Sequence, residues 1–163
     1  MSIAMNTIGR SDFDYIRELV QRRSAIVLEP DKAYLIETRL TPLARQRGFD
    51  SLQALIASLR SGAGDGLARQ VVEAMTTHET SFFRDFHPFE TLRTTVLPEL
   101  LAKRPPGQPL TIWCAACSSG QEPYSIAASL LRGFHDARKF DVKILASDID
   151  HSILEKALRA EYA

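Results

Sequence analysis

The sequence predicts an α + α/β protein, in which a small N-terminal helical bundle precedes the first βαβ part of an α/β domain. Three observations support this prediction. Apolar residues recur at helical spacing from about residue 10 to 75. A Pro-rich stretch then interrupts the chain over residues 104–109. Beyond it, two short apolar runs flank a helical pattern, which is the order typical of parallel strands joined by a crossover helix.

The composition is that of a soluble globular protein, with 45% apolar and 25% charged residues. Lys plus Arg and Asp plus Glu number 20 each, so the total charge gives no argument for nucleic-acid binding. No apolar run approaches the roughly 20 residues that span a bilayer, and the N-terminus lacks the apolar core of a secretory signal. We therefore expect a cytoplasmic protein with no nucleic-acid partner and no membrane insertion.

Four helices are expected in the first domain, residues 10–75. The first begins at Ser11, a plausible N-cap with Asp14 in the capping-box position. Turn signals bound the others. One runs from Pro30 to Gly48, one from Ser51 to Gly62, and one contains Leu67 to Met75.

The next segment changes character, because residues 75–85 are first polar and then aromatic without a clear period. A helix is expected from Phe86 to Lys103. Pro98 must kink or restart this helix, since proline lacks an N–H and clashes with the preceding turn.

The last third predicts two strands, Leu110–Ala116 and Val142–Ser147, whose nearly continuous apolar character indicates burial on both faces. A helix from Glu122 to Phe134 separates them, and another begins at Ser152 and reaches Arg159. The strand–helix–strand order predicts parallel strands with a right-handed crossover.

A possible ligand site lies where these elements meet. Gly120 is in the turn after the first strand, and Asp148, with Asp150 as the alternative, ends the second. Nucleotide-type ligands bind at such a turn, with a carboxylate on the ribose hydroxyls. A single glycine is weak support for a dinucleotide. A smaller cofactor such as S-adenosylmethionine and an ordinary α/β turn remain equally open at this point.

Two other motifs give no support for a metal. His78-Glu79 resembles the start of a zinc-protease helix, but Phe82 stands where the second histidine is needed. Cys114 and Cys117 have metal-type spacing without a second pair of ligands. We interpret the two cysteines as packing residues and expect no metal.

Three segments resemble the CheR family of chemotaxis receptor methyltransferases: residues 76–85, TTHETSFFRD; residues 112–125, IWCAACSSGQEPYS; and residues 146–150, ASDID. The order of these segments and the spacing between them also resemble those of the family. The resemblance covers about residues 13–162 and implies a helical domain followed by a class I (Rossmann-like) methyltransferase domain, truncated after its first βαβ part. The implied domains are residues 10–75, a linker with a cofactor-contacting segment over 76–109, and an incomplete cofactor-binding domain over 110–163.

The resemblance implies S-adenosyl-L-methionine as cofactor, S-adenosyl-L-homocysteine as product, and methylation of glutamate side chains on chemotaxis receptors. The implied cofactor-binding residues are His78, Thr80, Arg84, Glu122 and Asp148, with Arg84 also catalytic. The family often has Asn in place of His78. Arg84 suits the carboxylate of the methionine part, Glu122 its ammonium, and Asp148 the ribose diol.

The receptor's cytoplasmic region is the implied partner, and basic positions of the second helix are the implied docking residues: Lys32, Arg39 and Arg45. Lys32 and Arg39 are about two turns apart and share a face. A non-catalytic module that docks on receptors or another signalling partner is the alternative function. We also expect the chain to be a fragment of a longer protein, whose unpaired strand edge favours self-association.

Overall fold

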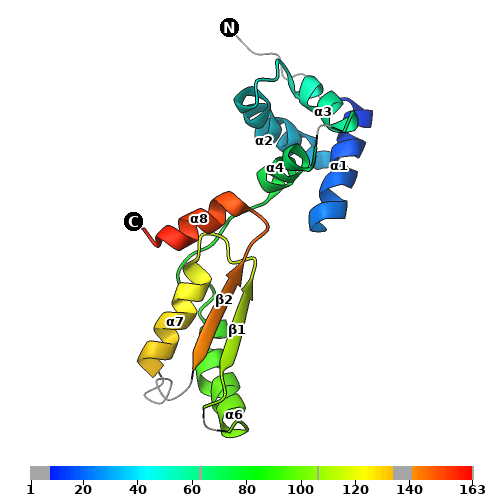
Figure 1. The fold of residues 1–163 in the computed structure, drawn as a ribbon. Coiled ribbons are helices and arrows are strands. Elements are labelled where there is room, and N and C mark those ends of the chain that lie inside the picture. The colour runs from blue at the N-terminus through cyan, green and yellow to red at the C-terminus, as the bar shows by residue number, and fades with distance from the viewer. Residues whose placement is uncertain (1–7, 63, 106, 134–140, 163) are drawn as a thin grey trace. The chain divides into compact units, whose positions relative to one another are not determined.

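The computed structural model describes residues 8–62, 64–105, 107–133 and 141–162. It divides into two compact units, a helical unit, Met1–Thr77, and an α/β unit, His78–Ala163 (Figure 1). The boundary between the units falls within the predicted linker, residues 76–109, after Thr77. Within the described residues, no helix combines the length and apolarity needed to cross a bilayer.

The helical unit contains the four expected helices. They are α1, Arg10–Ser24; α2, Ala33–Gln46, after a 3-10 turn at Pro30–Lys32; α3, Leu52–Arg60; and α4, Asp65–Met75. Each presents an apolar stripe to one shared core, whose fully buried members include Ile16, Ile36, Leu40, Leu55 and Val71. The helical periodicity of the sequence thus corresponds to the buried faces.

The helix ends follow the predicted signals except at the N-terminus of α1. The Ser51 hydroxyl accepts the amide of Ala54 at 3.1 Å, so Ser51 caps α3 as expected. The predicted N-cap at Ser11 is wrong, because α1 begins at Arg10 with Gly9 as its N-cap. Ser11 lies inside the first turn, where Arg60 donates to its hydroxyl at 3.2 Å and to its carbonyl at 2.8 Å.

The α/β unit begins with a helical segment and continues with alternating strands and helices (Figure 1). Its elements are α5, His87–Thr91; a π-helical turn, Leu92–Val96; α6, Leu97–Ala102; β1, Leu110–Ala115; α7, Gln121–Gly133; β2, Val142–Ser147; and α8, His151–Arg159. Pro98 lies in the first turn of α6, directly after the π-helical turn, so the predicted restart at this proline is confirmed. Phe134, the predicted end of α7, lies outside the described residues.

β1 and β2 are parallel, as predicted, in a register that runs from Leu110 opposite Val142 to Ala115 opposite Ser147. One face of this pair contributes Leu110 and Cys114 to a core that includes residues of α5, α6 and α7. On the other face, Trp113 is 67% exposed and Leu145 is 56% exposed. The expectation of burial on both faces is therefore wrong for the described chain, because its core residues gather on one side of the sheet.

Candidate functional site

The turn after β1 is a tight connection tied to the end of β2. Ala116 and Ser118 both have positive φ angles, of 59° and 51°. The Cys117 amide donates to the Ser147 carbonyl at 2.9 Å, which extends the parallel ladder past β1. The carboxyl ends of the two strands and the start of α7 therefore meet at one edge, which is where open α/β sheets bind ligands.

Gly120 is required by packing within this turn. Its φ is +98°, and a Cβ placed on it would lie 2.7 Å from the Tyr162 hydroxyl and 3.0 Å from the Ala157 Cβ. The Tyr162 hydroxyl also donates to the Ser119 carbonyl at 2.7 Å. The glycine thus permits α8 and the C-terminal tyrosine to approach the turn closely.

Asp148 connects the two turns at the carboxyl end of the strands. It is half-buried, and its Oδ2 accepts the Ser118 amide at 2.8 Å while its Oδ1 accepts the Asp150 amide at 3.0 Å. Each carboxylate oxygen has two acceptor positions, so each retains one among the hydrogen bonds of the described residues. This pair of acceptors fits the diol of a ribose, which offers two neighbouring O–H groups.

Both carboxylate oxygens of Asp150, the alternative to Asp148, are used by contacts within the fold. It is 4% exposed, and its Oδ1 caps α8 by accepting the Ser152 amide at 2.7 Å and the Ile153 amide at 3.3 Å. Its Oδ2 lies 2.9 Å from Nε2 of His78. These contacts favour Asp148 as the carboxylate that meets a ligand.

The segment that begins at His78 is hydrogen-bonded to the turn after β1 and to α7. The Ser118 hydroxyl donates to the His78 carbonyl at 3.3 Å, and the Phe83 amide donates to the Ser125 hydroxyl on α7 at 2.9 Å. The structure therefore brings His78 to the cluster of Ser118, Asp148 and Asp150. Thr80 is partly exposed two residues further along.

Arg84 lies in the same segment with an exposed side chain. Its Nη1 donates to the Glu79 carbonyl at 2.7 Å, and its Nη2 lies 3.6 Å from the Glu79 carboxylate. Both contacts hold the guanidinium within its own segment. The convergence of Arg84 and Asp148 on one ligand stays a prediction.

Glu122 is exposed on the first turn of α7, beside the buried Cys114. Burial raises the pKa of the Cys114 thiol to about 11, and the Glu122 carboxylate adds to this shift. Burial also raises the pKa of Cys117, with a further contribution from Asp148. Both cysteines are free and lie in the core of the unit, which agrees with their interpretation as packing residues.

We expect Cys114 to resist alkylation in the folded protein. At pH 9 the iodoacetamide reaction of Cys114 should be at least about fifty times slower than that of a free thiol, because its thiolate is scarce. Mass-spectrometric labelling with and without urea measures the alkylation rate; equal rates in both would contradict the expectation.

Because the unfolded thiol of Cys114 loses its proton first, the stability of the α/β unit should also fall as the pH rises from 9 towards 11.

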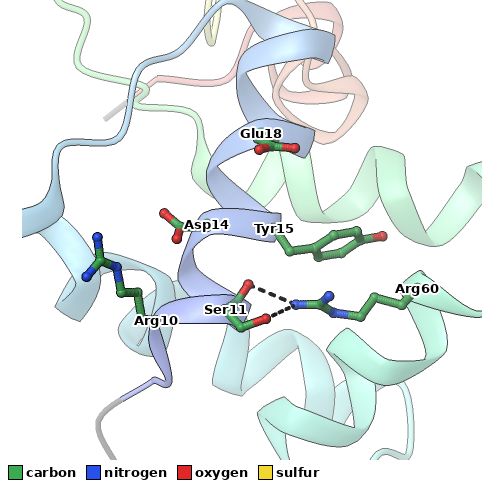
Figure 2. A pocket seen from close by; sticks show the side chains of 6 residues that line it. All are labelled: Arg10, Ser11, Asp14, Tyr15, Glu18 and Arg60. Carbon is green, nitrogen blue, oxygen red and sulfur yellow. Dashed lines mark hydrogen bonds between the residues drawn. The ribbon is translucent and has the colours of Figure 1, made fainter.

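The helical unit has a polar hollow of about 500 Å³ beside α1, lined by Arg10, Ser11, Asp14, Tyr15, Glu18 and Arg60 (Figure 2). Arg60 extends from the end of α3 towards Ser11, and its guanidinium lies 4.6 Å from the centre of the Tyr15 ring. None of the predicted site residues lines this hollow. The Arg60 guanidinium donates to Ser11 and Asp12, so its contacts join α1 to α3.

Of the predicted docking residues, Arg39 has a structural role that the sequence did not indicate. Its Nη1 donates at 2.8 Å to the carbonyls of Met75 and Thr76, at the end of α4. A cation at a helix C-terminus also stabilises the helix dipole. Lys32 is exposed and lies 3.2 Å from Asp31, and Arg45 is exposed on α2.

Replacing Arg39 by alanine is expected to destabilise the helical unit by about 2 kcal/mol, because hydrogen bonds to charged groups contribute about 1.5–3 kcal/mol. Arg45→Ala, on the same helix, is the matched control and should change stability by less than about 0.5 kcal/mol. Urea unfolding followed by circular dichroism measures both. Equal stabilities for the two variants would exclude the structural role.

The fold is that of a helical domain followed by the first part of a Rossmann-like α/β domain. The chain belongs to the CheR methyltransferase family: residues 11–76 match its all-alpha domain and residues 78–163 match its SAM binding domain. S-adenosylmethionine is therefore the cofactor of this domain.

Relatives with curated names agree with this family. The chain is 44% identical over 158 residues to chemotaxis protein methyltransferase 1 of Pseudomonas aeruginosa, and 40% identical over 157 residues to chemotaxis protein methyltransferase Cher2 of Pseudomonas putida. Each match covers 94% of this chain and 57% of the relative. The chain thus spans somewhat more than half the length of these relatives.

Proposed function

We propose that the protein transfers a methyl group from S-adenosylmethionine to glutamate side chains in the cytoplasmic region of chemotaxis receptors. The observation that carries this proposal is the half-buried Asp148 carboxylate at the end of β2, which retains acceptor positions after binding Ser118 and Asp150. It lies within the residues that match the SAM binding domain. The names of the relatives supply the chemotaxis context.

The chemistry asks the protein for alignment more than for proton transfer. Bound S-adenosylmethionine supplies a methyl carbon on a positive sulfonium, and a glutamate carboxylate, with a reference pKa of about 4.3, is already ionised near neutral pH. A carboxylate oxygen forms a bond to the methyl carbon while the carbon–sulfur electron pair returns to sulfur. No general base is needed, and the main task is to orient the reactants and exclude water.

In this proposal Asp148 accepts the ribose hydroxyls, and Glu122 accepts the ammonium of the methionine part. Arg84 exchanges its contacts with Glu79 for the methionine carboxylate, which suits a planar guanidinium. Arg84 then also contributes positive charge next to the reacting groups. Thr80, in the segment that begins at His78, completes the proposed cofactor contacts.

Receptor docking is assigned to the basic side chains of the helical unit. Lys32 and Arg45 are exposed and suit a surface that attracts an acidic receptor segment. Arg39 contributes through the fold, because its guanidinium is occupied at the end of α4.

Transfer of labelled methyl from S-adenosylmethionine to a receptor cytoplasmic fragment tests the proposal. The label should be released as methanol by mild base, because glutamate methyl esters hydrolyse, and Arg84→Ala should lose most of the transfer. Binding of S-adenosylhomocysteine without any transfer would favour the alternative, a non-catalytic docking module. Absence of both binding and transfer would reject the proposal.

We also propose that the isolated chain self-associates through its two-stranded sheet. Trp113 and Leu145 are large exposed apolar residues on one face of the sheet, and a parallel pair leaves strand edges free to accept another strand. Sedimentation velocity should show the average mass rising with concentration. A single monomeric species at the highest concentration reached would count against it.

A further inference from the structure

Four residues from three segments form a closed ring of polar contacts in the α/β unit, made of three hydrogen bonds and one contact between a ring nitrogen and a carboxylate. Nε2 of His78 lies 2.9 Å from Oδ2 of Asp150, and the Asp150 amide donates to Asp148 at 3.0 Å. The Ser118 amide donates to the other oxygen of Asp148 at 2.8 Å. The Ser118 hydroxyl closes the ring by donating to the His78 carbonyl at 3.3 Å.

Each member of the ring belongs to a segment that carries a proposed cofactor residue. His78 begins the segment with Thr80 and Arg84, Ser118 lies in the turn that leads to Glu122, and Asp148 ends β2. The ring therefore fixes the spacing of the three segments. Among the contacts of the described residues that make up the ring, His78 is the only residue of the first segment whose side chain takes part.

We propose that His78 is a positioning residue, which holds the segment carrying Thr80 and Arg84 against the two turns through the contact of its Nε2 with Asp150. This rests on the proposed function, because the turns that it aligns are those assigned to the cofactor. A carboxylate accepts hydrogen bonds and does not donate them, so this contact requires a donor at the position of Nε2. The buried Asp150 is a fixed anchor, since its other oxygen caps α8.

Direct contact of the His78 ring with the cofactor is the competing interpretation, and side-chain reach separates the two. A glutamine amide nitrogen extends about as far as Nε2 of histidine, whereas an asparagine amide nitrogen lies near the position of Nδ1. Positioning through Asp150 therefore requires the long donor and is restored by His78→Gln. The family's frequent asparagine would instead restore a direct cofactor contact.

Hydrogen exchange of the ligand-free protein tests the ring without any cofactor. The amides of Ser118 and Phe83 are reporters, because the first donates to Asp148 and the second to Ser125. In His78→Leu both should exchange about tenfold faster, the effect expected when a hydrogen bond to a charged group is lost. In His78→Gln both should stay within about twofold of the parent, since the donor is kept.

Asp150→Ser removes the oxygen that faces His78 and retains a side chain that caps helices well. It should accelerate exchange at Ser118 and Phe83 as His78→Leu does, and the two substitutions combined should have less effect than the sum of their separate effects, because both remove the contact between His78 and Asp150. Unchanged exchange at these amides in His78→Leu would overturn the proposal, whether or not the protein binds a cofactor.

Calorimetry with S-adenosylhomocysteine gives the second readout. The affinity should fall about tenfold in His78→Leu and His78→Asn and be kept in His78→Gln, in line with the loss of one charged hydrogen bond. Affinity kept in His78→Asn but lost in His78→Gln would overturn positioning in favour of direct contact. If the parent protein binds no S-adenosylhomocysteine, the proposed function fails, while the exchange data still decide the role of His78.

Discussion

Replacing Gly120 by alanine is expected to destabilise the α/β unit by about 2–4 kcal/mol. Its φ of +98° is costly for any residue with a Cβ, by about 1–2 kcal/mol. The new Cβ would also lie 3.0 Å from the Cβ and 3.2 Å from the Cα of Ala157, inside α8, and overpacking of this kind costs about 1–3 kcal/mol. The Tyr162 hydroxyl, at 2.7 Å, would have to leave the Ser119 carbonyl.

Gly107→Ala is the matched control for this effect. Gly107 lies in the same unit with a φ of +84°, and a Cβ added to it meets nothing within 4 Å. It should therefore show only the backbone cost of about 1–2 kcal/mol. Urea unfolding followed by the fluorescence of Trp113, the single tryptophan, reports on this unit. Equal losses in the two variants would contradict the close approach of α8.

Replacing Asp148 by alanine is expected to weaken S-adenosylhomocysteine binding about 100-fold or more. The variant removes the proposed acceptor for two ribose hydroxyls, and each hydrogen bond to a charged group contributes about 1.5–3 kcal/mol. It also leaves the amides of Ser118 and Asp150 without their acceptor, so the turns lose their alignment. Isothermal titration calorimetry measures the affinity.

Asp141→Ala is the control for Asp148→Ala. Asp141 precedes β2 at its other end, and its exposed carboxylate pairs only with Lys143 at 3.4 Å among the ion pairs of the described residues. Asp141→Ala removes one negative charge, as Asp148→Ala does, so a general electrostatic effect would appear in both variants. Unchanged affinity in Asp148→Ala, or an equal loss in Asp141→Ala, would refute the ribose assignment.

Much of the fold follows from local signals in the sequence. The four helices of the first unit are visible as apolar periodicity, and Ser51 and Pro98 mark helix starts through interactions within one turn. The parallel pairing of β1 and β2 follows from their short apolar runs and the intervening helix. These features were predictable because each depends on residues close together in the chain.

The errors and omissions concern contacts between distant residues. Serine is a residue type that often caps helices, but the Ser11 hydroxyl instead accepts a hydrogen bond from Arg60, 49 residues later. Arg39 has the appearance of a surface charge, but its partners are 36 and 37 residues away. The exposed face with Trp113 was missed because apolar strand residues do not reveal which face is covered.

The candidate site was predicted in part. Asp148 was identified from its position after β2, and the structure adds the reason for preferring it to Asp150, namely the cap of α8. The contact between His78 and Asp150 was not predictable, because it depends on the path of the segment between α4 and α5.

We propose that the turn after β1 and the carboxylate of Asp148 bind the same adenosyl ligand. Titration of the isotopically labelled chain with S-adenosylhomocysteine, followed by amide NMR, tests this most directly because it detects weak binding as well. We expect shifts centred on Ser118 to Glu122 and on Asp148 to Asp150, which disappear in Asp148→Ala. Shifts confined to the helical unit, or none up to the solubility limit of the ligand, would contradict it.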